Sequence, residues 1–352
     1  MTTGLLDGLR VLDFSLWQPG QYATQLLADL GADVVKVEPP GGDRMRALPD
    51  RFRAFNGHKC SLLLDLQRDA DRTEARRLAA GVEVVVEGYR PGVADRLGVG
   101  YDDLRKVNPA LVYCSISGYG RTGPMAATPG HDLNYQAYAG ALAPRPGERP
   151  AWPGVLVADQ GGGLAAAFSI LAAVLHARGT GEGEHIDLAM ADVVASWVGA
   201  VRRPQDTGAD DVLELPGLGI FATADGRHLV LGAALEDHFW ASLCRAVGLD
   251  DLAPLSLQER SARADELRGA LAGALARYLC DDVIARLEAI DVPVAPVLSR
   301  AEMLAHPHFR ARGVVTRGTD GEVAIGHPVR YVRHPARPPG PAPELPADVI
   351  GG

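Results

Sequence analysis

The chain has 352 residues, of which 47% are hydrophobic and 22% charged. This length and composition predict a globular protein with a substantial core and about two domains. Its 44 Asp and Glu outnumber its 35 Lys and Arg, and the resulting net charge of -9 argues against a nucleic-acid partner, which needs a basic face.

The N-terminus and the cysteines narrow the class of protein further. The opening "MTTGLLDGLRVLDFS" has no signal-peptide pattern, and no stretch approaches 18 uninterrupted apolar residues, so we expect a cytoplasmic protein without a membrane partner. The four cysteines are far apart and show no CxxC spacing. We therefore expect neither a metal site nor a disulfide framework.

The first 120 residues read as alternating strands and helices. Residues 9–15 form an apolar run, 20–32 have helical period, and 33–38 form a second short strand. The pattern recurs with a strand at 60–66, a helix at 69–81, and strands at 82–89 and 111–120. The expected fold is therefore α/β, with a Rossmann-like, largely parallel sheet.

The chain continues with elements that extend this layer and then reaches a boundary. We predict a helix rich in small side chains over 161–181, and a strand followed by a helix over 182–201. These elements complete a large domain over 1–201. Residues 202–218 lose periodicity and gather Pro, Gly and Asp, which indicates a linker.

Residues 219–300 predict a smaller α+β domain. Two strands are joined by a turn at Asp225 and Gly226, three helices follow, and a strand covers 292–298. We expect a return linker at 301–314, and a Pro-rich arm over 315–352 that completes the large domain as an extended segment on its surface.

Three polar residues are candidates for chemistry, and each also has a structural interpretation. Asp159 precedes the run "GGG" at 161–163, which can mean a helix N-cap, or a carboxylate facing a ligand whose oxyanion the glycine N–H groups stabilise. His131 lies in a polar loop, where Asp132 can fix its tautomer for proton transfer or simply complete a turn. Glu236 begins a helix, where the dipole favours acids.

The glycine run itself is a weak signal. It lacks the Lys and Ser or Thr of a phosphate-binding loop, and the spacing of a dinucleotide fold. Close packing of a helix against a neighbour is the alternative interpretation.

Several segments in order resemble the family III CoA-transferases and α-methylacyl-CoA racemases, the CaiB/BaiF-type superfamily. They include "DLGADVVKVEPPGGDR", the block from Glu87 to Pro124, "GHDLNY", "ADQGGG" and "DVPVAPVL", and the resemblance covers nearly the whole chain. It implies an enzyme that acts on CoA thioesters, with an acyl-CoA as substrate, CoA as carrier and no permanently bound cofactor. It also implies an interlocked homodimer, which suits the long linkers.

The resemblance places CoA contacts on loops that follow strands. The implied contact residues are Gln18, Pro19, Leu64, Asp65, Leu66, Gln67, Gly88, Tyr89 and Arg90, with Arg96 for a phosphate. One position departs from the family pattern: Pro39 stands where an Arg near the nucleotide end of CoA is usual. Lys36, Arg44 and Lys59 are the neighbouring cations that can replace it.

Two reactions are implied, and both use Asp159. In the racemases this Asp and the His of "GHDxNY" are the two acid/base groups that flank Cα, so Asp159 and His131 would exchange the α-proton while Glu236 supports His131. In the transferases the Asp attacks the thioester and forms an acyl-aspartyl anhydride.

The sequence favours the racemase or epimerase, acting on a 2-methylacyl-CoA, and keeps the transferase as the alternative. His131, Asp159 and Glu236 together support proton transfer, and they argue against a CoA-binding dimer without chemistry. Against the racemase, "LELPGLGIF" replaces the usual "DGGAP" segment, and Gln18 and the wording "KVEPPGGD" are commoner among transferases.

Overall fold

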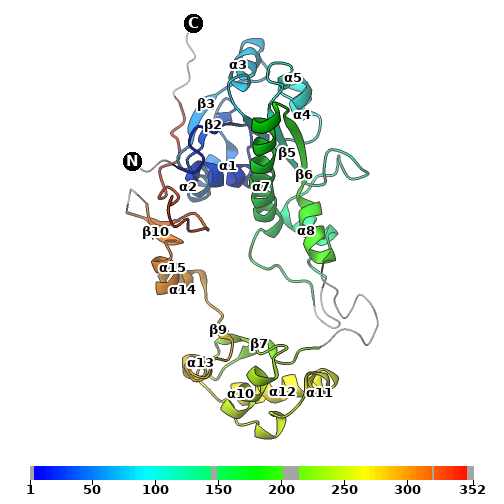
Figure 1. The fold of residues 1–352 in the computed structure, drawn as a ribbon, viewed down its shortest axis with the longest axis vertical. Coiled ribbons are helices and arrows are strands. Elements are labelled where there is room, and N and C mark those ends of the chain that lie inside the picture. The colour runs from blue at the N-terminus through cyan, green and yellow to red at the C-terminus, as the bar shows by residue number, and fades with distance from the viewer. Residues whose placement is uncertain (1–3, 144–148, 201–213, 319–320, 347–352) are drawn as a thin grey trace. The chain divides into compact units, whose positions relative to one another are not determined.

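The computed structural model describes residues 4–143, 149–200, 214–318 and 321–346 (Figure 1). Contacts divide the chain into unit 1, Met1–Val201 with Pro307–Gly352, and unit 2, Arg202–His306. Most of the linker expected at 202–218 lies outside the described residues. The expected return linker at 301–314 carries the short helices α14 (Arg300–Ala305) and α15 (Pro307–Ala311). The domain boundaries inferred from the sequence stay predictions.

Unit 1 is built on a six-stranded sheet. Its strands, in spatial order, are β3 (Cys60–Leu63), β2 (Asp33–Glu38), β1 (Arg10–Asp13), β4 (Val84–Glu87), β5 (Val112–Ser117) and β6 (Glu184–Ala189). All neighbouring strands are parallel. The order reverses between β1 and β4, the kind of position at which open α/β sheets bind ligands beyond the carboxyl ends of the strands. The expected α/β fold with a central parallel sheet is confirmed.

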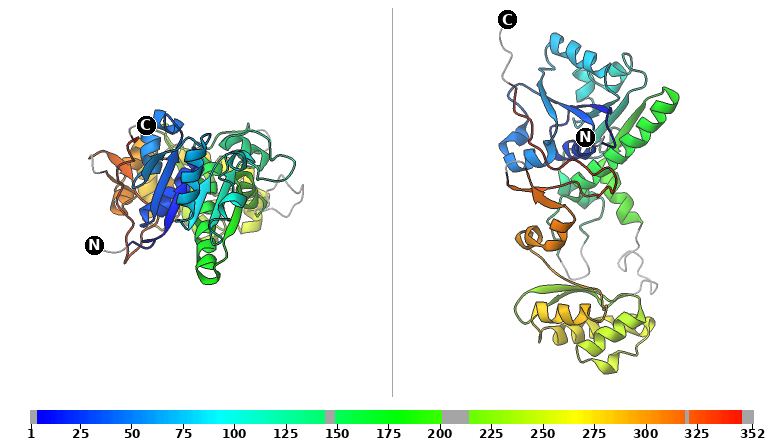
Figure 2. Two further views of the ribbon diagram at one scale, coloured as in Figure 1. Left: turned by 90° about the horizontal axis from the view of Figure 1, so that it is seen from above. Right: turned by 60° about the vertical axis from the view of Figure 1, so that its left-hand side comes forward.

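Helices cover both faces of this sheet (Figure 2). One core packs α1 (Gln18–Asp29), α6 (Asp132–Tyr138), α7 (Val157–Thr180) and α8 (Met190–Gly199) on the sheet, and a second core packs α3 (Asp69–Ala79), α4 (Val93–Arg96) and α5 (Tyr101–Leu104). After β2 come the 3-10 helix η1 (Arg44–Ala47) and α2 (Pro49–Asn56).

The helix α7 begins four residues earlier than the sequence predicts. Its first turn therefore contains Asp159, and the three glycines lie inside the helix. Among the described helices α7 is long and apolar enough to cross a membrane, and half of its apolar window is buried against the rest of the protein. It ends where Gly181 adopts φ 79°, a left-handed conformation that glycine tolerates.

Unit 2 is an antiparallel sheet covered by helices. Its strand order is β7 (Leu218–Ala222), β8 (His228–Gly232) and β9 (Val294–Pro296), with the expected turn at Asp225 and Gly226 joining the first two. The helices are α10 (Asp237–Ala246), α11 (Leu257–Ala262), α12 (Ala264–Leu275) and α13 (Cys280–Glu288), with the 3-10 helix η2 (Asp250–Leu252). Their core includes Trp240, Leu271 and Leu287.

The C-terminal arm returns to unit 1. A short hairpin of β10 (Val315–Arg317) and β11 (Val323–Ile325) precedes it. The Arg337 N–H donates to the Asp29 carbonyl at 2.7 Å, and His58 Nε2 lies 2.7 Å from the Pro338 carbonyl. Arg46 donates to the Pro343 carbonyl. The described part of the arm thus lies along α1, α2 and η1.

Candidate active site

A cavity of about 760 Å³ lies beyond the carboxyl ends of β1, β4 and β5 in unit 1. Residues 16–20, 88–91 and 116–119, which end or follow those strands, line one side of it. Residues 128–132, Asn134 and Tyr135 line another side together with Leu156 and Asp159 at the start of α7. The segment of η1 and α2 contributes Met45, Leu48 and Arg51. Strand order alone predicts a ligand site here.

The cavity brings together seven of the residues that the sequence singles out. They are Gln18, Pro19, Gly88, Tyr89, Arg90, His131 and Asp159. Leu64 to Gln67 and Arg96 do not line it: Leu64 and Leu66 are buried in the core below α3, and Arg96 is exposed on α4. Glu236 belongs to unit 2, where it is the exposed residue preceding α10. The roles of all these residues stay predictions.

Asp159 does not cap its helix, so that interpretation of the sequence is wrong. Leu156 is the N-cap residue and makes no side-chain capping bond, whereas Asp159 is the third residue of the first turn. The cap comes from elsewhere in the chain. Asp132, which is buried, accepts hydrogen bonds through Oδ1 from the N–H groups of Ala158 at 2.7 Å and Asp159 at 3.0 Å.

Asp132 therefore holds the loop before α6 to the first turn of α7. Its Oδ2 atom accepts a short hydrogen bond from Gln136 Nε2. A buried carboxylate at the N-terminus of a helix is stabilised by the free N–H groups and by the helix dipole. The sequence suggests that Asp132 orients His131. In the structure the Asp132 carboxylate instead binds the backbone N–H groups of Ala158 and Asp159 and the side chain of Gln136.

His131 stands at the N-terminus of α6 with an exposed side chain that lines the cavity. Its backbone N–H donates to Asn134 Oδ1 at 3.0 Å, and Tyr135 donates its hydroxyl to the Gly130 carbonyl. The Asn and Tyr of "GHDLNY" thus fix the peptide group that joins Gly130 to His131. Three side chains of the motif, those of Asp132, Asn134 and Tyr135, thus hold the starts of α6 and α7 in place.

The environment of Asp159 raises the pKa of its carboxyl to about 7. Burial is the main cause, the negative charge of Asp132 adds to it, and the positive charge of Arg51 opposes both. A carboxyl with a pKa near the operating pH exists in both protonation states, as a general acid or base requires. Arg51 was not predicted as a site residue, because helix α2 was not recognised in the sequence.

The glycine run serves packing. A Cβ on Gly161 would meet Trp197 at 2.4 Å, one on Gly162 would meet Met190 at 2.7 Å, and one on Gly163 would meet the Pro19 carbonyl at 2.7 Å. None of the three lines the cavity. They let α7 approach α1 and α8 closely, so the interpretation as helix packing is confirmed over ligand contact.

Glu87 supports the loop that carries Gly88, Tyr89 and Arg90. Its side chain is 2% exposed, and its Oε2 atom accepts from the Tyr89 N–H at 2.7 Å. Burial raises the pKa of this carboxyl to about 7, although hydrogen bonds from Ser115 and the Tyr89 backbone counteract the rise. The Glu87 side chain therefore fixes the backbone of the loop, while Gly88, Tyr89 and Arg90 line the cavity.

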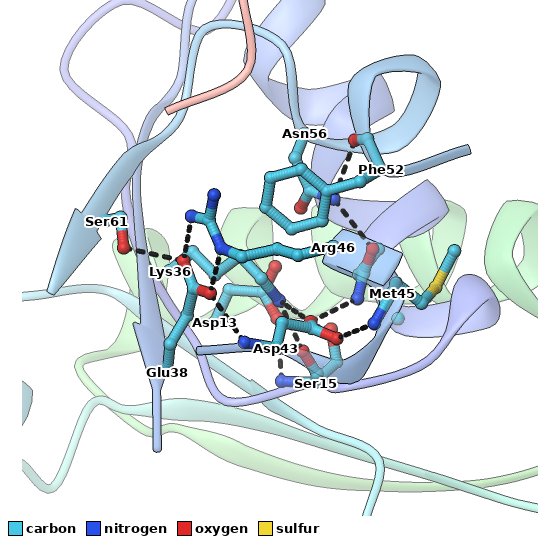
Figure 3. Close-up of polar contacts among 12 residues, drawn as sticks. Asp13, Ser15, Lys36, Glu38, Asp43, Met45, Arg46, Phe52, Asn56 and Ser61 are labelled. Atoms are coloured by element: carbon cyan, nitrogen blue, oxygen red, sulfur yellow. Dashed lines mark hydrogen bonds and ion pairs between the residues drawn. The ribbon is translucent and has the colours of Figure 1, made fainter. Parts of the chain in front are cut away.

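A buried polar network lies under the other strand loops (Figure 3). Lys36 donates to the Ser15 carbonyl at 2.7 Å and forms an ion pair with Asp43 at 2.7 Å, and the Arg46 guanidinium binds Glu38 through two nitrogens. Asp43 also accepts from the Met45 N–H. The network fixes the backbone next to Leu16 and Met45, two cavity residues.

The same network removes two candidates for the cation that replaces the usual Arg at Pro39. Lys36 is fully buried and bound to Ser15 and Asp43, and Lys59 is 4% exposed and bonded to Asp13 and Thr24. Neither ammonium reaches solvent, where a phosphate would bind. Arg44 is exposed and remains available.

In the described parts of the chain, no group of three or more His, Cys, Asp or Glu side chains is placed so that it could hold a metal ion. Three of the free cysteines are buried and Cys60 is exposed.

Comparisons with protein families, with curated proteins and with solved structures all find related proteins. The family model described as CoA-transferase family III matches residues 6–349. The chain is 36% identical to succinyl-CoA:mesaconate CoA-transferase of Haloarcula hispanica over 97% of this chain and 94% of the relative. It is 33% identical to alpha-methylacyl-CoA racemase of Mus musculus, over 90% and 84%. A solved CaiB/BaiF family protein from Brucella suis superposes with a TM-score of 0.86, at 29% identity, over 98% of this chain and 97% of that one.

Proposed function

Since this chain belongs to CoA-transferase family III, whose relatives include both CoA-transferases and a racemase, we propose that it racemises or epimerises the α-carbon of a 2-substituted acyl-CoA. Asp159 and His131 are the two groups that exchange the α-proton. CoA enters as part of the substrate, and no permanently bound cofactor takes part.

In the proposed reaction one group removes the proton from Cα and the electron pair moves to the thioester oxygen, which gives an enolate. The other group then donates a proton to the opposite face of Cα. Each group ends in the protonation state with which the other began, so a second proton exchange with solvent resets the site. Hydrogen-bond donors near the enolate oxygen lower the barrier.

One observation carries this proposal: His131 and Asp159 line the same cavity, and the pKa of Asp159 is raised to about 7. Burial that favours the neutral carboxyl prepares it to hold and return a proton. The ionised form is needed both to remove the α-proton and to attack the thioester, so the support for proton transfer comes from the second acid/base group, His131, in the same cavity.

CoA transfer is the second candidate, and two observations favour it. The relatives named by the comparison are mostly CoA-transferases, and Gln18 lies in the cavity with Asp159. In that reaction the Asp159 carboxylate attacks the thioester carbonyl, the CoA thiolate leaves, and an acyl-aspartyl anhydride forms. The thiolate then attacks the aspartyl carbonyl of the anhydride, which releases the first acid and leaves an aspartyl-CoA thioester. The carboxylate of a second acid attacks this thioester, expels the thiolate and forms a new anhydride. The thiolate finally attacks the acyl carbonyl of that anhydride, which gives the new acyl-CoA and free Asp159.

Deuterium incorporation separates the two candidates. The protein is incubated in deuterated water with 2-methylacyl-CoA thioesters of several chain lengths, and deuterium at Cα is followed by mass spectrometry. The proposal predicts incorporation with at least one thioester. Three results together would establish the transferase instead. No thioester of the panel would take up deuterium at Cα, CoA would be transferred to added acids, and hydroxylamine or borohydride would modify Asp159.

We also propose that the chain acts in the cytoplasm as a homodimer, with the chains interlocked as the family resemblance implies. An apolar stripe on α7 supports a partner: Leu164, Phe168 and Leu175 are 55%, 73% and 73% exposed and lie on one helical face. Sedimentation velocity tests this, since a monomer at micromolar concentration would exclude a stable dimer.

Glu236 remains the proposed support for His131. A Glu236→Gln variant should slow proton exchange while CoA binding stays nearly unchanged. If exchange is unaltered, Glu236 plays no part in the reaction.

A further inference from the structure

The cavity holds a guanidinium that neither the fold nor the proposed reaction uses. Arg51, on α2, lines the cavity and is exposed. Within the described residues its guanidinium has no hydrogen bond or ion pair, whereas Arg46 binds Glu38 and Arg53 pairs with Asp50 at 3.3 Å. Arg51 is therefore free to bind a ligand.

Arg51 lines the same cavity as Asp159, the residue proposed to act at the thioester. Its positive charge acts on Asp159 and opposes the rise of that carboxyl's pKa, after burial and the charge of Asp132 in size. The phosphates of CoA are separated from its thioester by the whole pantetheine arm. A cation close to the reacting carboxylate is thus next to the thioester and acyl group, far from those phosphates.

The charges around the cavity leave this cation without a partner in the protein. The carboxylate of Asp132 is already bound to two backbone N–H groups and to Gln136. Asp159, the other lining carboxyl, takes up and releases a proton in the proposed reaction. A neutral acyl group that excluded water from Arg51 would leave its charge poorly solvated, and that costs free energy.

We propose that Arg51 binds a second carboxylate on the acyl group, which makes acyl-CoA substrates that are monothioesters of dicarboxylic acids the preferred class. This rests on the proposed function in one respect, that Asp159 acts at the thioester end. A guanidinium fork binds carboxylate oxygens in pairs, and Met45 and Leu48, which line the cavity from the same segment, suit the intervening carbon chain.

A matched pair of substrates tests the assignment. 2-Methylsuccinyl-CoA with the thioester at C1 ends in a carboxylate, and 2-methylbutanoyl-CoA has a methyl group at that place. The wild type should exchange the α-proton of the first with the higher kcat/KM. In Arg51→Gln the ratio of the two kcat/KM values should fall by about 10- to 100-fold, mainly through KM of the carboxylated substrate.

Two further variants control for charge and folding. Arg53→Gln removes a cation from the same helix outside the cavity, so it should leave the ratio unchanged. Arg51→Lys should restore part of the preference, because an ammonium keeps the charge without the fork. An unchanged ratio in Arg51→Gln, or a wild type without preference for the carboxylated thioester, would overturn the assignment.

Equilibrium binding separates this proposal from the proposed function. Calorimetric titration of both thioesters into wild type and Arg51→Gln requires no turnover. A preference for 2-methylsuccinyl-CoA that disappears in the variant supports Arg51 even if no α-proton exchange occurs, and in that case only the racemase assignment fails. Equal affinities in the wild type would reject Arg51 as a carboxylate site.

Discussion

The carboxylate of Asp132 accepts a hydrogen bond from the backbone N–H of Asp159 at 3.0 Å. Through this bond the residue after His131 anchors the helix turn that carries Asp159. This hydrogen bond joins the segment of His131 to the segment of Asp159, the two proposed acid/base groups. A change in Asp132 should therefore affect the chemistry of Asp159.

An Asp132→Asn variant should shift the pH dependence of α-proton exchange. The negative charge of Asp132 raises the pKa of Asp159, so its removal should lower that pKa, and the acidic limb of the kcat/KM profile should move to lower pH. The amide oxygen still accepts from the Asp159 N–H, so the fold should persist.

Asp132→Ala is the matched control for structure. It leaves buried N–H groups without an acceptor and should cost about 1–3 kcal/mol of unfolding free energy. A pH profile that is identical in wild type and Asp132→Asn would show that the charge of Asp132 does not act on the reacting group.

Replacing Asp159 by Asn should stabilise the fold at alkaline pH. The pKa of Asp159 is about 7 in the fold and 3.8 for the ordinary group, so the folded state binds its proton more tightly than the unfolded chain does. The stability that this proton contributes is full below pH 3.8 and is lost as pH rises through about 7.

Because Asp159 is only partly buried, we expect Asp159→Asn to gain roughly 1–2 kcal/mol at pH 8.5 and nothing near pH 4. Urea denaturation at both pH values measures this. A variant that is equally stabilised at the two pH values would contradict the raised pKa.

Glu87 should matter for binding more than for chemistry. In Glu87→Ala the Tyr89 N–H loses its acceptor, and the loop over Gly88 to Arg90 becomes less well positioned, so KM for acyl-CoA should rise about tenfold with a smaller change in kcat. Glu87→Gln keeps an acceptor oxygen and should stay near the wild type. Steady-state kinetics on the three proteins decides it, and a change confined to kcat would place Glu87 in the chemical step.

Two glycines of α7 should respond in opposite ways to the same substitution. In Gly163→Ala the new methyl group would stand 2.7 Å from the Pro19 carbonyl, which separates α7 from α1 and should cost about 1–3 kcal/mol. Gly179 has nothing within 4 Å of its Cβ position, so Gly179→Ala should be neutral or stabilising by up to about 1 kcal/mol. Thermal melts would contradict the packing role if both variants behaved alike.

The sequence predicted the sheet well because its strands are apolar on both faces and alternate with helices. Strands β1, β2 and β4, with α3, fall within the predicted ranges, and α1 begins at Gln18, two residues before its predicted start. The start of α7 was misplaced because its cap is Asp132, which lies 27 residues before Asp159 and gives no local signal. Helix α2 was missed, since its apolar residues are few and Pro49 at its start was not recognised as a signal.

Cavity residues were singled out from the sequence where they follow strands or stand in a quoted motif, as Gln18, Gly88 and His131 do, and their roles stay predictions. Arg51 was missed because its role depends on where α2 places it, and nothing near it in the sequence points to a ligand. Lys36 and Lys59 illustrate the opposite case: the sequence suggested exposed cations, but the charge network under the strand loops buries both.

The most direct measurement follows α-proton exchange from each enantiomer separately. In deuterated water, His131→Gln and Asp159→Asn are each given the R and the S form of the preferred 2-methylacyl-CoA. If the two residues serve opposite faces of Cα, each variant should still exchange the proton of one enantiomer, and the two variants should retain opposite enantiomers. Exchange from both enantiomers in either variant, or acyl transfer from a trapped Asp159 anhydride without any exchange in the wild type, would contradict two-base proton transfer.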